Sequence, residues 1–151
     1  MKNIIIKMFV LSALFVVSQQ SLQAANPISI TFFGSKAIGG YDAVAYHTAK
    51  KAIAGNKKFA TTWKGANWFF FSAKNLQTFL AEPTKYAPQY GGYCAWAAAD
   101  NRLVKADPKI FDLHEGKLYL NYNKKTQRDW NVDRQGMITR GDRNYPKLIA
   151  K

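Results

Sequence analysis

The chain has 151 residues, with 22 Lys and Arg against 9 Asp and Glu, and a formal net charge of +13. Its one cysteine, Cys94, excludes an internal disulfide, so in an oxidising compartment this thiol is buried, reactive or joined to another molecule. The sequence has no phosphate-cradling glycine loop, no nucleophilic serine motif and no spaced metal motif such as Cys-x-x-Cys, which excludes the enzyme classes that these motifs mark.

The N-terminus has the order of a secretory signal. Lys2 and Lys7 precede an almost wholly apolar run over residues 8–17, which is too short to span a bilayer comfortably. We therefore predict a cleaved signal over residues 1–24 and one mature domain over residues 25–151, periplasmic or secreted; a retained N-terminal anchor is the alternative. Cleavage leaves 20 basic and 9 acidic residues, a net charge of +11. The basic residues are dispersed, so we expect mainly a solvated basic surface; an anionic envelope surface is the alternative partner, and no specific nucleic-acid partner is predicted.

The first part of the mature chain predicts β-structure. Residues 28–33 alternate enough for an edge strand, which the following glycines end. Residues 59–63 and 68–71 flank Lys64-Gly65-Ala66-Asn67, whose glycine and asparagine favour a tight reversal, so this segment predicts a hairpin.

Two helices are predicted between the β segments. Ser72 can cap a helix that ends or restarts at Pro83. A second helix is predicted to begin near Gly91-Gly92 and to run through an alanine-rich stretch to Ala99.

A second hairpin is predicted beyond these helices. Phe111 and Leu113 alternate before a Glu115-Gly116 turn and residues 118–122 alternate after it, which indicates one buried face. Asn123 can cap a following helix that carries Trp130. The sequence shows no internal repeat, and we predict a single α+β domain with a small antiparallel sheet built from hairpins and packed short helices.

Several segments resemble the YHS-domain family, and its exported branch most closely. They are Gly40-Tyr41-Asp42-Ala43-Val44-Ala45-Tyr46, Trp68-Phe69-Phe70-Phe71-Ser72, Glu82-Pro83-Thr84-Lys85-Tyr86, the run from Tyr86 to Ala95, and the run from Gly116 to Asn123. The resemblance implies a metal-handling role, with copper the usual ion and cysteines near a strand-to-helix junction as ligands. This chain has Phe71 and Asn75 where the resemblance implies a cysteine pair, and Ala45 where it implies an earlier cysteine.

Cys94 is the candidate for chemistry, as a catalytic thiol or a metal ligand. If a helix starts at the glycine pair, its first turn stabilises a thiolate and lowers the pKa of the thiol. A buried cysteine that packs beside Ala97 and Ala98 is the alternative, because free cysteines are among the most buried residues.

The remaining candidate site residues are histidines and aromatics. His47 and His114 could join Cys94 around a transition-metal ion such as copper if the fold brings them together. Tyr46, Tyr93 and Trp96 could line a cofactor pocket near the thiol, although aromatic side chains of this kind are more often in the core. Strand alternation directs His114 away from the buried face.

Three functions follow from these residues. The leading hypothesis is an exported module that handles a metal ion or a redox equivalent through Cys94. The second is a thiol redox enzyme that needs an external small thiol to resolve its oxidised state, since the chain has no second cysteine. The third is a basic module that binds an anionic envelope surface and uses the cysteine only for packing.

Overall fold

A computed structural model describes residues 24–150, so the predicted signal peptide falls almost wholly outside the described residues. The elements, in chain order, are η1 (Ile38–Gly40), α1 (Ala43–Ala49), β1 (Asn56–Trp63), β2 (Ala66–Phe70), α2 (Ala73–Ala81), α3 (Pro83–Tyr86), η2 (Gln89–Gly92), α4 (Ala95–Ala99), β3 (Asp107–His114), β4 (Lys117–Asn121), α5 (Lys124–Val132) and α6 (Arg134–Ile149). Helices and two separate antiparallel hairpins confirm the predicted α+β class.

The same chain path occurs twice. Each element of residues 38–86, which we call the first half, has a counterpart 51 or 52 residues later in residues 89–149, the second half. α2 and α5 have the same length, and α3 corresponds to the start of α6. The prediction of no internal repeat is therefore wrong at the level of structure. The repeat escapes the sequence because equivalent positions carry different side chains, such as Asp42 and Cys94.

The two hairpins match residue for residue. In the first, Trp63 pairs with Ala66 and a bulge interrupts the ladder between Asn56 and Ala60. The second has the same register and a bulge at the equivalent place. Both reverse through a two-residue turn in which both residues have positive φ, Lys64-Gly65 and Glu115-Gly116. Turns of this kind suit the twist of antiparallel strands, which explains why both hairpins were predictable.

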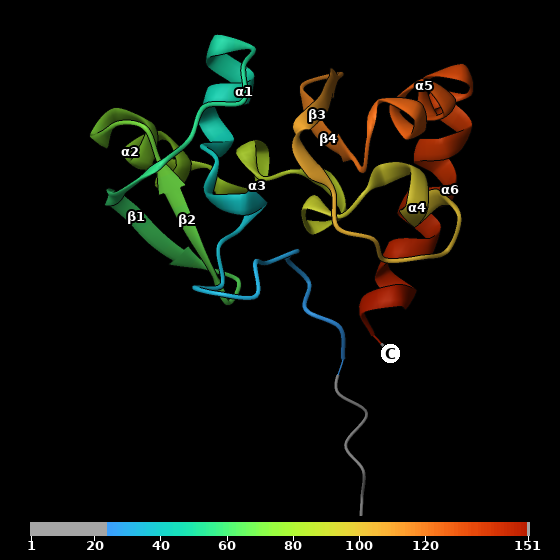
Figure 1. The fold of residues 1–151 in the computed structure, drawn as a ribbon, viewed down its shortest axis with the longest axis horizontal. Helices are drawn as coiled ribbons and strands as arrows, with labels where there is room; N and C mark the ends of the chain where they lie inside the picture. Colours follow the sequence, from blue (N-terminus) through green and yellow to red (C-terminus); the bar gives the residue numbers. More distant parts are fainter. Residues whose placement is uncertain (1–23, 151) are drawn as a thin grey trace, which may run out of the picture.

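The halves lie side by side and share a core (Figure 1). Trp68, Phe70 and Phe79 of the first half belong to the same buried cluster as Leu118 and Leu120 of β4. A second cluster lies within the second half and its members are Tyr90, Ala95, Ala98, Tyr119, Trp130 and Ile138. β4 therefore buries both of its faces. The predicted single buried face is wrong because Tyr119 packs in the second cluster, on the side opposite Leu118 and Leu120, which face the first half.

Two other sequence predictions need correction. Residues 28–33 form no strand: Ile30 makes one bridge to Ala37, and the chain between them is a tight turn. The helix predicted from Gly91 begins instead at Ala95, because Gly91 and Gly92 have positive φ and form the 3-10 turn η2. The helix capped by Ser72 and the one capped by Asn123 are confirmed.

Helix α6 was not predicted, because glycines and Pro146 obscure its pattern. It packs on Tyr90, whose hydroxyl donates to the Asp142 carboxylate at 3.0 Å. Gly141 allows this contact, since a Cβ there would lie 2.6 Å from the Tyr90 ring.

Over residues 24–150, the structure has no helix long and apolar enough to cross a membrane.

Candidate functional site

Cys94 lies at the junction between the η2 turn and α4, as the N-cap residue of that helix. Its side chain is only 1% exposed. The Tyr122 amide donates a hydrogen bond to Sγ at 3.3 Å, and the thiol donates to Asn121 Oδ1 at 3.7 Å. The sulfur is thus held from two sides by the end of β4.

A cavity of about 340 Å³ opens beside this sulfur, and we call it the Cys94 pocket. It is lined by Cys94, Trp96, Ala97, Arg102, Val104, Tyr122, Asn123 and Thr126. The Arg102 guanidinium lies 5.6 Å from the centre of the Trp96 ring and pairs with Asp100 at 2.8 Å. The pocket therefore combines a thiol, aromatic walls and one cationic side chain.

The first half has an aspartate, Asp42, at the position equivalent to Cys94, and shows the structural role of this position without a thiol. Asp42, the counterpart of Cys94, caps α1 and is fully buried. Its carboxylate accepts four hydrogen bonds, from the amides of Val44, Ala45 and Phe71 and from Asn75 Nδ2. In both halves the backbone amide of this residue donates at 2.8 Å, to Ile53 in the first and to Val104 in the second. The shared backbone role is structural.

Two side chains replace the carboxylate in the second half. Cys94 Sγ accepts from the Tyr122 amide, the counterpart of the Phe71 amide, while Asn121 Oδ1 accepts from the Trp96 amide at 3.2 Å. The sequence analysis missed Asn121, although a polar residue that ends an apolar strand was a usable signal. Asn121 is fully buried and its Nδ2 has no hydrogen-bond partner. Cys94 Sγ therefore accepts one hydrogen bond where the Asp42 carboxylate accepts four.

A family model for the YHS domain matches residues 44–90, from α1 to η2. The chain carries a YHS domain. This confirms the resemblance to the YHS-domain family over residues 44–90, while the likeness to the exported branch stays a prediction. The match covers most of the first half, extends into η2 and ends before Cys94, so the thiol lies outside the matched residues. Searches of curated proteins and of solved structures gave no match.

The YHS half does not fit the copper site that the family resemblance implies. The implied thiolate positions carry Ala45, Phe71 and Asn75. Asn75 Nδ2 is held by Asp42 at 2.7 Å, so this side chain supports the carboxylate. Cu(I) selects soft sulfur ligands, and this half contains none.

The predicted metal ligands come from three elements: His47 from α1, His114 from the end of β3, and Cys94 from the cap of α4. No group of three or more His, Cys, Asp or Glu side chains that could hold a metal lies within residues 24–150. His114 Nδ1 instead lies 3.4 Å from the Arg134 guanidinium. Within residues 24–150, a metal at Cys94 would therefore lack a set of three such ligands.

His47 sits edge-on to Tyr86, with ring centroids 5.3 Å apart. Its Nε2 is buried without a hydrogen-bond partner. Burial lowers the pKa of His47 below 6.5, opposed by a hydrogen bond with the backbone of Tyr86. His47 therefore titrates as a partly buried imidazole in the first half.

Of the aromatic residues predicted to surround the thiol, Trp96 lines the Cys94 pocket. Tyr46 is fully buried in the shared core and donates to the Pro108 carbonyl at 2.8 Å, joining the halves. Tyr93 donates to the Asn26 carbonyl at 3.0 Å. Tyr46 and Tyr93 are not among the pocket-lining residues, and their hydrogen bonds hold parts of the chain together.

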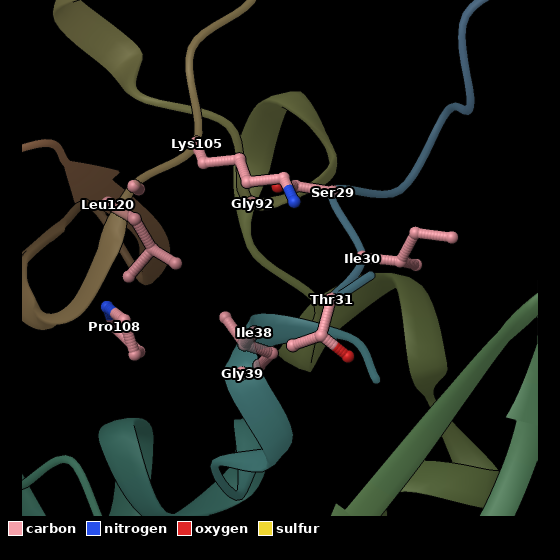
Figure 2. A pocket seen from close by; sticks show the side chains of 10 residues that line it. Ser29, Ile30, Thr31, Ile38, Gly39, Gly92, Lys105, Pro108 and Leu120 are labelled. Carbon is pink, nitrogen blue, oxygen red and sulfur yellow. The ribbon is translucent and has the colours of Figure 1, made fainter. Parts of the chain in front are cut away.

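A smaller cavity of about 110 Å³ lies between the halves (Figure 2). Gly39 and Gly92, from the equivalent turns η1 and η2, form part of its wall, and the Lys105 side chain extends across it toward Ser29. None of the predicted site residues lines this cavity. The Cys94 pocket is therefore the candidate site.

Proposed function

We propose that this YHS-domain protein is exported and handles a redox equivalent through Cys94, by forming a mixed disulfide with a small molecule that enters the Cys94 pocket. The observation that carries the proposal is the position of Cys94, which lines the cavity and whose Sγ accepts a hydrogen bond from the Tyr122 amide at 3.3 Å. The hydrophobic wall around Trp96 and the charge of Arg102 suit a small anionic disulfide.

The chemistry is one thiol–disulfide exchange. The Cys94 thiolate attacks one sulfur of the disulfide. A new S–S bond forms, the old one breaks, and the other sulfur leaves with its substituent as a thiolate. Because the chain has no second cysteine, an external thiol must attack the mixed disulfide to restore Cys94. No metal ion takes part in this cycle.

Mass spectrometry of the intact protein tests the proposal. Chain purified from the exported fraction is incubated with oxidised glutathione, and we expect one adduct per chain that dithiothreitol removes. The Cys94→Ser variant should form none. Arg102→Glu should slow the reaction severalfold, because like charge repels the anionic disulfide, while a neutral disulfide should react unchanged. Arg128→Glu, on α5 and outside the pocket lining, is the matched control.

Two outcomes would contradict this function. If native protein forms no adduct while unfolded protein does, Cys94 is a packing residue. If one equivalent of Cu(I) or Zn(II) blocks adduct formation in the wild-type chain at low free-metal concentration, Cys94 is a ligand of a soft metal ion whose other ligands come from a second molecule.

A further inference from the structure

Two adjacent phenylalanines protrude from the turn over residues 31–36, which we call the Phe turn. Phe32 is 87% exposed and Phe33 is 81% exposed. Their rings contact each other edge to face, with centroids 4.9 Å apart. Single exposed apolar residues are ordinary, but two exposed aromatic rings packed together form an apolar tip that needs an explanation.

The Phe turn is closed by its own hydrogen bonds. The Thr31 amide donates to the Lys36 carbonyl at 3.1 Å, and the Lys36 amide donates to Thr31 Oγ1 at 3.1 Å. The Thr31 hydroxyl donates to the Phe33 carbonyl at 2.6 Å. Gly34 and Ser35 complete the reversal with positive φ. The two rings are therefore presented by an ordered turn, so their exposure is a property of the fold.

This turn is fixed onto the reversal between β1 and β2 (Figure 1). The Asn67 amide donates to the Ser35 carbonyl at 2.9 Å, and Asn67 Nδ2 donates to the Gly34 carbonyl at 3.0 Å. The adjoining hairpin turn carries Lys64, whose Nζ lies 4.6 Å from the centre of the Trp63 ring. The aromatic tip thus lies beside a lysine-bearing turn.

The chain segment that carries this tip has exposed charge of one sign. Residues 24–81 contain seven lysines and a single acidic residue, Asp42, which is fully buried. Lys36 lies within the Phe turn and Lys64 in the turn that holds it. The exposed formal charge of this stretch is therefore entirely positive. A surface that joins apolar rings to lysines complements a layer with an anionic exterior and a hydrocarbon interior.

We propose that the Phe turn and the β1–β2 turn form a docking surface for an anionic lipid bilayer. Phe32 and Phe33 enter the boundary between headgroups and acyl chains, while Lys36 and Lys64 contact anionic headgroups. A lipid surface fits better than a protein partner because the apolar part is a protruding tip flanked by cations. This role is independent of the thiol chemistry, since Cys94 belongs to the second half.

Co-sedimentation with vesicles tests the surface. Exported, purified chain is mixed with vesicles of phosphatidylcholine alone or with phosphatidylglycerol as about one third of the lipid. We expect binding to the anionic vesicles that weakens as salt is raised. Phe32→Ser/Phe33→Ser should weaken it at least about tenfold, because the burial of two aromatic side chains is lost. Val132→Ser is the matched control: Val132 is 87% exposed but lies on α5 of the second half.

Charge variants complete the test. Lys36→Gln/Lys64→Gln should reduce binding and flatten its salt dependence, whereas Lys124→Gln/Lys125→Gln on α5 should change both much less. All variants share one N-terminus, so any contribution of that segment cancels. Equal binding of the Phe variant and the Val132 control would overturn the proposal. Concentration-dependent dimers that the Phe variant abolishes, without vesicle binding, would overturn it in favour of a second copy as the occupant.

Discussion

The two halves have the same backbone path but carry different acceptors at one equivalent buried position, Asp42 and Cys94. In the first half Asp42 accepts four hydrogen bonds, and in the second half Cys94 and Asn121 divide that task. The comparison shows that the fold requires hydrogen-bond acceptors here and does not require a thiol. A cysteine that lines a cavity at this position is therefore not explained by the hydrogen bonds of the turn alone.

The surfaces of the halves differ as well. Residues 24–81 expose only positive formal charge, whereas residues 82–150 carry 12 basic and 8 acidic residues. The exposed aromatic pair lies in the uniformly basic stretch, and the thiol pocket lies in the stretch of mixed charge. The proposed attachment surface and the proposed site of chemistry therefore belong to different parts of the chain.

Removing the buried acceptor should damage the first half more. Asp42→Ala leaves several buried N–H groups unpaired, so we expect a loss of about 3 kcal/mol in the free energy of unfolding. Cys94→Ala should cost about 1 kcal/mol, because sulfur is the weaker acceptor and Asn121 remains. Urea unfolding of both variants measures the difference. Equal losses would contradict the claim that Asp42 stabilises the fold more than Cys94 does.

Equivalent glycines give the next comparison. Gly39 and Gly91 both have φ near +60°, so alanine is strained at either. A Cβ at Gly91 would also lie 1.9 Å from the Pro27 carbonyl oxygen, while one at Gly39 would lie 3.4 Å from Pro108 Cγ. Gly91→Ala should therefore lower stability by about 1–3 kcal/mol more than Gly39→Ala. Thermal or urea unfolding measures this difference. A loss at Gly91 no larger than the loss at Gly39 would show that the backbone around Pro27 moves away from the new Cβ at little cost in free energy.

The smallest expected effect concerns pH. Burial lowers the pKa of His47 in the folded chain below 6.5, so at mildly acid pH the unfolded chain binds more protons. The stability that depends on neutral His47 is fully present above pH 6.5 and is lost as pH falls from there toward the pKa of His47 in the folded chain. Urea midpoints between about pH 7.5 and 5.5 should fall less in His47→Gln than in wild type. Thr48→Ala controls for a local change in α1, and identical slopes for all three chains would contradict this account.

The sequence predicts what local chemistry determines. Both hairpins and the helices capped by Ser72 and Asn123 follow from turn residues, alternation and caps. The repeat, the second buried face of β4 and the role of Asn121 depend on contacts between distant segments. Residues 28–33 alternate like a strand but find no strand partner, because the turn closed by Thr31 and Lys36 takes their place. Cys94 could be selected as a candidate because it is the one cysteine, while its pocket depended on where Arg102, Tyr122 and Thr126 fold.

The most direct test of the central claim is the rate at which Cys94 is alkylated in the native chain. A small iodoacetamide reagent is added across pH and at increasing urea concentrations below the unfolding transition. If the thiol is reached through the Cys94 pocket, the rate should not change with urea in that range, and Thr126→Phe, which narrows the pocket, should slow it. A rate that rises with urea in step with the unfolded population would show that Cys94 reacts only when the chain opens, and would contradict a functional thiol.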